Sequence, residues 1–321
     1  MKVLLISPYP PPLGGVSVFT KRRKRALSAE GHQVDVLDPT KMSAPRYFFK
    51  LLLTRFKSYD LISVNVYSPY VSMILYALGL ARKVEVIDHN WRQLERWGKT
   101  KRRIYSRVLS RSKELILMGE HLRDYYAAHN VALPERVSVK DSFIPPPPED
   151  EELILKTYPP DLLAFIAQRR PLIIANAPRI VFYKSVDLYA LDMCVHLVAS
   201  LKQEFANVCL LFALAEIGDE EYFEKINRLV DKLSIRENFS FLIGQKELWP
   251  LFKSADLMVR PTNTDGISVS VAEALYFGCP AVASDAVERP AGTIIFRNRD
   301  GEDFLRKCEE ALNTGRRTTS F

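Results

Sequence analysis

The chain has 321 residues, of which 47% are hydrophobic and 26% charged, and its formal net charge at pH 7 is +7. This length accommodates two ordinary domains, and the composition is typical of a globular protein and excludes a disordered or fibrous chain. No run of eighteen apolar residues occurs, so we expect no membrane-spanning helix.

The basic excess belongs to the first half of the chain. Residues 1–160 carry a net charge of +10, whereas residues 161–321 carry −3. A basic half of this kind can bind nucleic acid, an anionic lipid surface or a phosphorylated substrate.

The beginning of the sequence and its cysteines favour a cytoplasmic protein. A strand-like run, Lys2–Ile6, starts the chain without the basic start, apolar core and small-residue cleavage site of a secretory signal. The four cysteines lie far apart and form no Cys-x-x-Cys pair. We therefore expect them to be reduced and mostly buried.

Short apolar strands alternate with helices through the first half, which predicts parallel βαβ units and a doubly wound sheet. The predicted strands are Val3–Ser7, Gln33–Leu37, Leu61–Val66, Val84–Ile87, Glu114–Leu117 and Arg136–Lys140. The predicted helices are Val16–Glu30, Tyr47–Phe56, Tyr70–Leu80, Lys101–Ser110 and Glu120–His129. Ligands of such sheets bind beyond the carboxyl ends of the strands.

Two strand ends in this half carry candidate functional residues. The turn after the first strand contains Gly14 and Gly15, which let the backbone approach a ligand, although a plain turn is at least as common. This turn lacks the Gly-x-Gly-x-x-Gly fingerprint of dinucleotide-binding folds. His89 directly follows the strand Val84–Ile87 and its neighbour Asp88, and it is either a structural histidine or a site residue.

A proline-rich segment separates the two halves. Pro145 to Pro148 are consecutive prolines, which stiffen the chain, and an acidic run follows them. We therefore predict an N-terminal domain of residues 1–150 and a C-terminal domain of residues 151–321.

The second half repeats the α/β pattern. The predicted strands are Pro171–Asn176, Val208–Phe212, Phe239–Leu242, Asp256–Arg260 and Pro280–Ser284. The predicted helices are Leu188–Lys202, Glu220–Leu233, Lys246–Ser254, Val269–Phe277 and Gly301–Asn313.

The loop and helix between the last two predicted strands contain two carboxylates, Asp265 and Glu273, eight positions apart. Because Asp265 precedes the helix and Glu273 lies inside it, the two could flank a ligand at the helix N-terminus. We expect backbone N–H groups at Gly266, Ile267 and Ser268 to bind an anion such as phosphate there.

This stretch resembles the donor-site signature of retaining GT-B glycosyltransferases, in particular family 4. That signature has two Glu residues at this spacing, followed by Gly and Pro-Val-Val-Ala-Ser; here Asp265 replaces the first Glu and Gly278-Cys-Pro-Ala-Val-Ala-Ser284 follows. A second segment is similar to the family's Gly-Arg-Leu-x-x-x-Lys-Gly-x-Asp-Leu. It supplies Arg179 and Lys184, with Ser185 at the position of the Gly.

The resemblance implies two Rossmann-like domains with parallel sheets facing across a cleft, with a C-terminal helix that crosses back to the first domain. It implies a nucleoside diphosphate sugar as donor substrate and no cofactor. Arg179 and Lys184 would hold the donor diphosphate, and Glu273 the ribose. Asp265 would hold the sugar hydroxyls. His89 and the Gly14–Gly15 loop would approach the donor from the other domain.

No metal is expected, because Arg179 and Lys184 already neutralise the diphosphate and no Asp-x-Asp motif occurs. The resemblance also implies retention of configuration without a protein nucleophile.

A basic cluster follows the Gly14–Gly15 turn. It consists of Lys21, Arg22, Arg23, Lys24 and Arg25. The cluster is either a solvated helix face or a surface for an anionic membrane or a lipid-diphosphate-linked saccharide acceptor. Nucleic acid is a poor match, because no known binding module accompanies the charge. We therefore expect transfer to a lipid-linked saccharide in the assembly of a surface polysaccharide, with peripheral attachment to the inner face of the membrane.

Other functions stay open. The chain could be a non-catalytic nucleotide-sugar-binding partner of another transferase, because Asp265 is one methylene shorter than the family's Glu. A nucleotide-sugar epimerase or a phosphorylase on the same fold is a further possibility. An NAD-dependent oxidoreductase is disfavoured, since the glycine fingerprint is absent.

Overall fold

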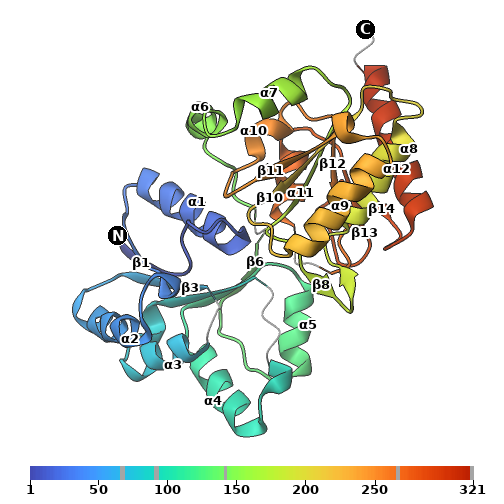
Figure 1. Cartoon of the computed structure of the whole chain (residues 1–321). Helices are drawn as coiled ribbons and strands as arrows, with labels where there is room; N and C mark the ends of the chain where they lie inside the picture. The colour runs from blue at the N-terminus through green and yellow to red at the C-terminus, as the bar shows by residue number, and fades with distance from the viewer. Residues whose placement is uncertain (66–68, 90–93, 141–142, 265–267, 319–321) are drawn as a thin grey trace. The chain divides into compact units, whose positions relative to one another are not determined.

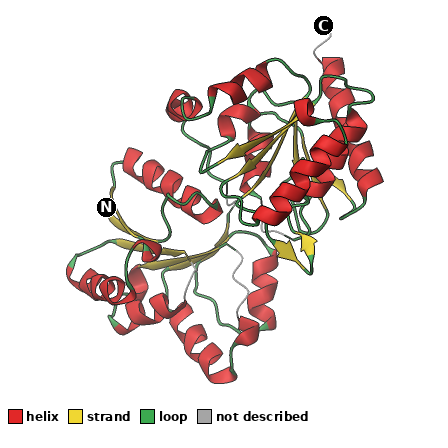
Figure 2. Cartoon of the chain, viewed as in Figure 1, coloured by secondary structure: helices red, strands yellow, loops and turns green. Residues whose placement is uncertain are grey.

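The computed structural model describes residues 1–65, 69–89, 94–140, 143–264 and 268–318, with side chains up to residue 314. The chain divides into two compact units, Met1–Ile144 and Pro145–Phe321. Each unit contains a six-stranded sheet with helices on its faces, so each is a layered α/β structure (Figures 1 and 2). The division falls at the start of the proline-rich segment, just before the boundary predicted after residue 150.

The first unit is built on a parallel sheet with the strand order β2-β1-β3-β4-β5-β6. The strands are β1 (Lys2–Ile6), β2 (Gln33–Leu37), β3 (Leu61–Asn65), β4 (Val84–Asp88), β5 (Glu114–Leu117) and β6 (Val137–Val139). The order reverses direction between β1 and β3, which makes the carboxyl ends of these two strands the switch point of this sheet.

Helix α1 covers one face of this sheet and the remaining helices cover the other (Figure 1). The helices are α1 (Gly15–Ala29), α2 (Ala44–Leu53), the short 3₁₀ helix η2 (Thr54–Phe56), α3 (Pro69–Ala77), α4 (Lys99–Leu109) and α5 (His121–Ala128). Phe19 of α1 packs with Ile87 and Ile116, whereas Leu51 of α2 and Leu75 of α3 belong to the core on the opposite face.

The second unit is built on a parallel sheet with the strand order β11-β10-β7-β12-β13-β14. The strands are β7 (Leu172–Ala177), β10 (Cys209–Leu214), β11 (Phe239–Ile243), β12 (Leu257–Arg260), β13 (Ala281–Ser284) and β14 (Ile294–Phe296). Here the order reverses between β7 and β12, so the switch point lies at their carboxyl ends.

Both faces of this second sheet are covered. The helices are α6 (Glu151–Leu155), α7 (Pro160–Ala167), α8 (Leu191–Leu201), α9 (Glu220–Lys232), α10 (Trp249–Phe252), α11 (Val269–Tyr276) and α12 (Gly301–Thr318). One core contains side chains of α8, α9 and α12, and the other contains side chains of α7, α10 and α11.

The predicted C-terminal helix Gly301–Asn313 is present as α12, and its packing within the second unit is well defined. It contacts α8 and the strands β12, β13 and β14. Phe304, Cys308, Ala311 and Leu312 form its buried stripe in the core of that unit. The apolar face of the helix is therefore already used by its own sheet.

The structure contains elements that the sequence did not predict. They are the helices α6 and α7, the strand β14, and an antiparallel hairpin formed by β8 (Phe182–Tyr183) and β9 (Val186–Asp187). Throughout the described part of the chain, no helix combines the length and apolarity needed to span a bilayer.

Asp187, at the end of β9, organises the segment that follows β7. Its side chain is buried and accepts backbone N–H bonds from Tyr189 (3.0 Å) and Leu191 (2.7 Å), which fixes the start of α8. The Tyr222 hydroxyl of α9 donates to the same carboxylate at 3.3 Å, and Asn263 Nδ2 donates to the Asp187 carbonyl at 2.6 Å. Asp187 thus joins the hairpin, two helices and the loop after β12.

We expect Asp187→Ala to lower the free energy of unfolding by about 2–3 kcal/mol, because it leaves the N–H groups of Tyr189 and Leu191 without an acceptor. The free energy of unfolding of Asp187→Asn should lie between those of Asp187→Ala and the wild type, because the amide oxygen of Asn keeps one acceptor. Urea denaturation measures both.

Asp219→Ala is the matched control for Asp187. Asp219 is the N-cap of α9, with Tyr222 N donating to its side chain at 2.9 Å, but it is only partly buried. Its loss should cost about 1 kcal/mol. Equal losses at both positions would show that the burial of Asp187 and its further contacts add nothing to stability.

Candidate functional site

The switch point of the second sheet is held together by Arg260 at the end of β12. Its buried guanidinium donates to the Asn176 carbonyl of β7 at 2.6 Å and lies 4.9 Å from the centre of the Tyr189 ring. The two strands on either side of the crevice are thereby joined at the edge where ligands of such sheets bind. Arg260 was not among the predicted site residues, although a cation that ends an apolar strand was a usable signal.

Arg179 lies on the loop that leaves β7. Its side chain is 57% exposed, with an ion pair to Glu216 at 3.2 Å. The loop pairs with the one after β10, because Ile180 N donates to Ile217 O at 2.9 Å. Gly218 permits this approach, since a Cβ at its φ of +84° would stand 2.7 Å from the Ile180 carbonyl oxygen. Arg179 is therefore a solvent-accessible cation on a rigid loop.

Lys184 lies at the tip of the β8–β9 hairpin. The two turn residues, Lys184 and Ser185, have φ of 50° and 63°, and positive φ at both positions marks a type I′ turn. The Lys184 ammonium is 5.4 Å from the centre of the Tyr183 ring. Ser185 stands where the related motif has Gly, so the turn explains the preference of the motif for that residue.

We expect Ser185→Gly to raise the free energy of unfolding by about 0.5–1 kcal/mol, because a left-handed backbone costs about 1–2 kcal/mol in a non-glycine residue and glycine loses more chain entropy. Thermal and urea denaturation measure the change. Ser234, with φ 54° at the end of α9, is the matched position. A stabilised Ser234→Gly beside a destabilised Ser185→Gly would argue against strain in the hairpin.

Of the residues predicted around α11, the structure describes Ser268 and Glu273. Ser268 is the N-cap, so the N–H groups of the first helical turn belong to Val269, Ser270 and Val271. Glu273 is buried in the second turn, with 7% exposure. Asp265, Gly266 and Ile267 lie outside the described residues.

The loop after β12 is fixed by a further arginine that sequence reasoning missed. Arg289 Nε donates to the Ser284 carbonyl at 2.9 Å, and its NH2 group donates to Thr262 Oγ1 at 2.9 Å. The Ser284 hydroxyl donates to the Thr262 carbonyl at 2.5 Å. These bonds hold the base of the loop that leads to α11.

In the first unit, Gly14 and Gly15 are exposed at the start of α1. Gly14 N donates to Ser17 Oγ at 2.9 Å, and Ser17 Oγ donates to the Pro12 carbonyl at 2.8 Å. The turn is thus ordered by the side chain of Ser17. It presents the positive end of α1 to solvent at the carboxyl edge of β1.

His89 belongs to a polar chain at the carboxyl ends of β1, β3 and β4. The contacts run from Ser7 Oγ to Thr20 Oγ1 (2.6 Å), from Thr20 to Asn65 Nδ2 (3.5 Å), and from Asn65 Oδ1 to His89 Nε2 (2.8 Å). The ring of Phe19 packs edge-on at 4.8 Å from the His89 ring. Burial, together with the charge of Arg23, lowers the pKa of His89 to about 4. His89 is therefore neutral at pH 7.

The lowered pKa of His89 predicts a loss of stability in acid. Between pH 6.5 and pH 4 the unfolded chain binds a proton that the folded chain does not, so the free energy of unfolding falls as the pH is lowered through this window. The contribution of this residue is at most about 3 kcal/mol. Urea denaturation at pH 7 and pH 4.5 measures it. The His89→Gln variant should show a smaller pH dependence, and an equal one would assign the effect to other groups.

Only some side chains of the predicted basic cluster lie on the surface. Arg22 is buried, and its guanidinium donates to the Ile144 carbonyl at 3.0 Å. Arg23 pairs with the buried carboxylate of Glu85 at 2.5 Å. Lys24 lies 5.5 Å from the centre of the Tyr9 ring. Two of the five cations therefore support the fold of the first unit, and Lys21 and Arg25 also have partners.

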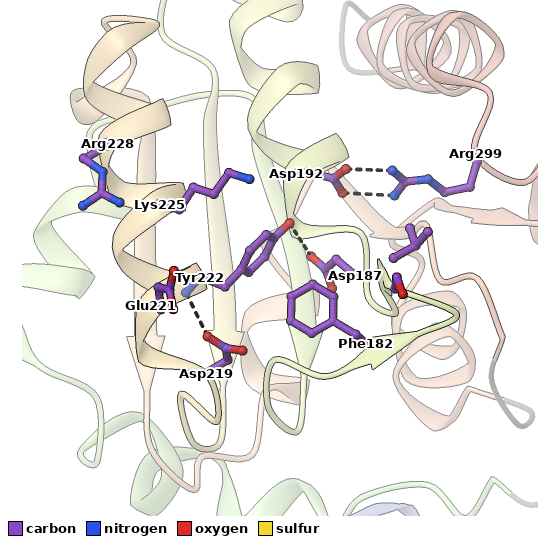
Figure 3. A pocket seen from close by; sticks show the side chains of 11 residues that line it. Phe182, Asp187, Asp192, Asp219, Glu221, Tyr222, Lys225, Arg228 and Arg299 are labelled. Carbon is purple, nitrogen blue, oxygen red and sulfur yellow. Dashed lines mark hydrogen bonds and ion pairs between the residues drawn. The ribbon is translucent and has the colours of Figure 1, made fainter.

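A pocket of about 580 Å³ lies between the hairpin, α8 and α9 (Figure 3). Three of its carboxylates have structural partners. Asp187 accepts from the first N–H of α8, Asp219 caps α9, and Asp192 forms two bonds to the guanidinium of Arg299, at 3.1 and 2.7 Å. These three carboxylates hold the scaffold behind Lys184, whereas Glu221, Lys225 and Arg228 of α9 also line the pocket.

The four cysteines are free and buried, as expected from the sequence. Burial raises the pKa of each thiol, which keeps the cysteines unreactive. Within the residues that the structure describes, no group of three His, Cys, Asp or Glu side chains is placed to hold a metal ion.

Two α/β units, each with a parallel sheet and a switch point at its carboxyl edge, define the GT-B fold. Residues 166–307 match the family model of glycosyl transferases group 1. The chain is 26% identical over 127 residues to the lipopolysaccharide glucosyltransferase WaaG of Escherichia coli K12, a match that covers 36% of this chain and 33% of the relative. It therefore spans about a third of the length of this curated relative.

Solved structures are similar over nearly the whole chain. A glycosyltransferase from Rickettsia africae has a TM-score of 0.70 at 11% identity. The match covers 97% of this chain and 88% of the Rickettsia chain. HepE of Anabaena in complex with UDP-glucose has a TM-score of 0.65 at 15% identity. The match covers 99% of this chain and 91% of the HepE chain. These structures establish the fold, and the family model with the WaaG match supports a glycosyltransferase family.

Proposed function

We propose that this chain is a retaining, metal-independent glycosyltransferase that moves a sugar from a nucleoside diphosphate sugar to a saccharide acceptor. The observation that carries the proposal is the placement of Arg179 and Lys184. Both belong to the connection that follows β7, one of the two strands that flank the switch point of the unit in which the group 1 family match lies. The solved structure of HepE with UDP-glucose supports a donor of this class.

In the proposed reaction, Arg179 and Lys184 bind the donor diphosphate. A guanidinium offers a planar fork and an ammonium a point charge, and both suit phosphate. As the bond to the sugar breaks, negative charge grows on the departing diphosphate, and the two cations stabilise it. Such electrostatic stabilisation is usually the largest contribution in a site of this kind.

The other roles follow from the resemblance of the motifs. Glu273 accepts from the ribose hydroxyls, and Asp265 holds the sugar, with Gly266, Ile267 and Ser268 supplying N–H donors. His89 and the Gly14–Gly15 turn contribute from the first unit. The acceptor hydroxyl attacks from the side on which the diphosphate leaves, and a phosphate oxygen takes its proton. No protein nucleophile or metal is then required.

We propose a lipid-linked saccharide as the acceptor and assembly of a surface polysaccharide as the pathway. The WaaG relative is described as a lipopolysaccharide glucosyltransferase, and the first half of this chain carries a net charge of +10. A cytoplasmic enzyme attached to the inner face of a membrane would meet such an acceptor.

The shorter carboxylate at position 265 favours a second candidate, a nucleotide-sugar-binding partner without activity of its own. Incubation with UDP-glucose and a range of saccharide acceptors separates the two. Release of UDP that depends on an acceptor supports the transferase, and tight donor binding without any release supports the partner. Conversion of the free donor to an isomer would instead indicate an epimerase.

We expect Arg179→Ala and Lys184→Ala each to weaken UDP binding by about ten- to a hundredfold, because each removes a charge-assisted contact worth about 1.5–3 kcal/mol. Isothermal titration measures the affinity. Both side chains are exposed, so the variants should stay folded.

Arg236→Ala is the matched control for Arg179. Arg236 is 47% exposed and pairs with Asp231 at 2.8 Å, far along the chain from the β7–α8 connection. UDP affinity should not change in this variant. Wild-type affinity in both Arg179→Ala and Lys184→Ala would remove the diphosphate role from these residues.

A further inference from the structure

Three phenylalanines of the first unit point into solvent from one short segment. Phe48 and Phe49 of α2 and Phe56 of η2 are 48%, 61% and 81% exposed. We call these three residues the α2 aromatic patch. Phenylalanine is among the residues most often buried, and neighbouring exposed aromatic side chains mark interaction surfaces.

The segment formed by α2 and η2 has one apolar side that packs against the core and a second apolar side that is exposed to solvent. Leu51 and Thr54 are buried against the unit, and Tyr47 is partly buried beside them. Phe49 and Phe56 are seven positions apart, or about two helical turns, and therefore lie on the same outward side. An ordinary surface helix would place polar side chains there.

The segment around the patch is exclusively basic. Between Asp38 and Asp60 the chain contains no Asp or Glu. It contains five cations, all exposed, which are Lys41, Arg46, Lys50, Arg55 and Lys57. Exposed aromatic rings flanked by Lys and Arg are the composition of helices that lie in the interface of a lipid bilayer.

We infer that α2 and η2 dock the first unit on an anionic lipid bilayer, with the α2 aromatic patch inserted among the acyl chains and the five cations at the headgroups. The charge complementarity selects anionic lipid, because each Lys or Arg near such a surface adds to the attraction. The inference deepens the proposed function, in that it assigns a surface that would bring the enzyme to a lipid-linked acceptor.

This surface differs from the one that the sequence indicated. Arg22 and Arg23 in the predicted cluster are engaged within the fold, whereas the cations around the patch are exposed, and of these Lys41 also donates to the Pro10 carbonyl at 3.0 Å. Helix α2 also lies on the opposite face of the sheet from α1 (Figure 1). Docking through α2 therefore leaves the face with α1 uncovered.

The test is co-sedimentation of the full chain with vesicles of phosphatidylcholine alone and of phosphatidylcholine with phosphatidylglycerol, at low and high salt. We expect binding to the anionic vesicles that weakens with salt. Phe49→Ser with Phe56→Ser should reduce this binding about tenfold or more, because each ring that enters the bilayer contributes to affinity. Lys50→Gln with Lys57→Gln should reduce it and flatten its salt dependence.

Ile104→Ser is the matched control. Ile104 is 52% exposed on α4, another basic helix of the same unit. Its loss should leave vesicle binding unchanged. Phe56→Ser alone changes only one exposed ring, so its vesicle binding can be measured even if the double variant does not fold. It should also bind anionic vesicles more weakly than the wild type.

Three results would overturn the inference. The first is equal vesicle binding by the wild type and the Phe49→Ser/Phe56→Ser variant. The second is loss of vesicle binding in Ile104→Ser. The third is a wild type that is dimeric without vesicles while the Phe49→Ser/Phe56→Ser variant is monomeric. UDP titration on the same proteins keeps the donor proposal and the docking proposal apart. Vesicle binding without UDP binding would contradict the proposed nucleotide-sugar donor and leave the docking surface intact. UDP binding without vesicle binding would contradict this inference and the membrane attachment, and would leave the proposed donor intact.

Discussion

The second unit depends on one buried carboxylate, that of Asp187. The two carboxylate oxygens accept from backbone N–H groups at the start of α8, and the Tyr222 hydroxyl of α9 donates to the same carboxylate. The backbone carbonyl of Asp187 accepts from the side chain of Asn263. Burial raises the pKa of this carboxyl, while the N–H bonds from Leu191 and Tyr189 lower it. The segment after β7 and the loop after β12 are thus tied to one point, which fixes the backbone at both sides of the switch point.

This arrangement separates the residues that fix the backbone from the two cations that we propose to bind the donor diphosphate. Asp187, Arg260 and Arg289 are at least partly buried and bond to the backbone or to Thr262 and Ser284. Arg179 and Lys184 are exposed on a loop and a two-residue turn. Cations on a rigid backbone lose little conformational freedom on binding an anion, which is how preorganised sites raise affinity.

The sequence predicted the α/β class and nearly all the sheet strands, since apolar runs between helices are local signals. It missed β8 and β9 because two-residue strands carry no periodicity, and it also missed the three-residue strand β14. The roles of Arg22 and Arg23 were not predictable, because their partners Ile144 and Glu85 are distant in sequence. The outward direction of Phe49 and Phe56 likewise depends on which side of α2 meets the sheet.

The polar chain from Ser7 to His89 has an electrical consequence for the first unit. Each of its members is uncharged at neutral pH, because the lowered pKa of His89 excludes the imidazolium form. An anion near the Gly14–Gly15 turn would therefore experience the dipole of α1 and the permanently charged side chains, with no titrating contribution from His89. Over the range in which most histidines change charge, this part of the field stays constant.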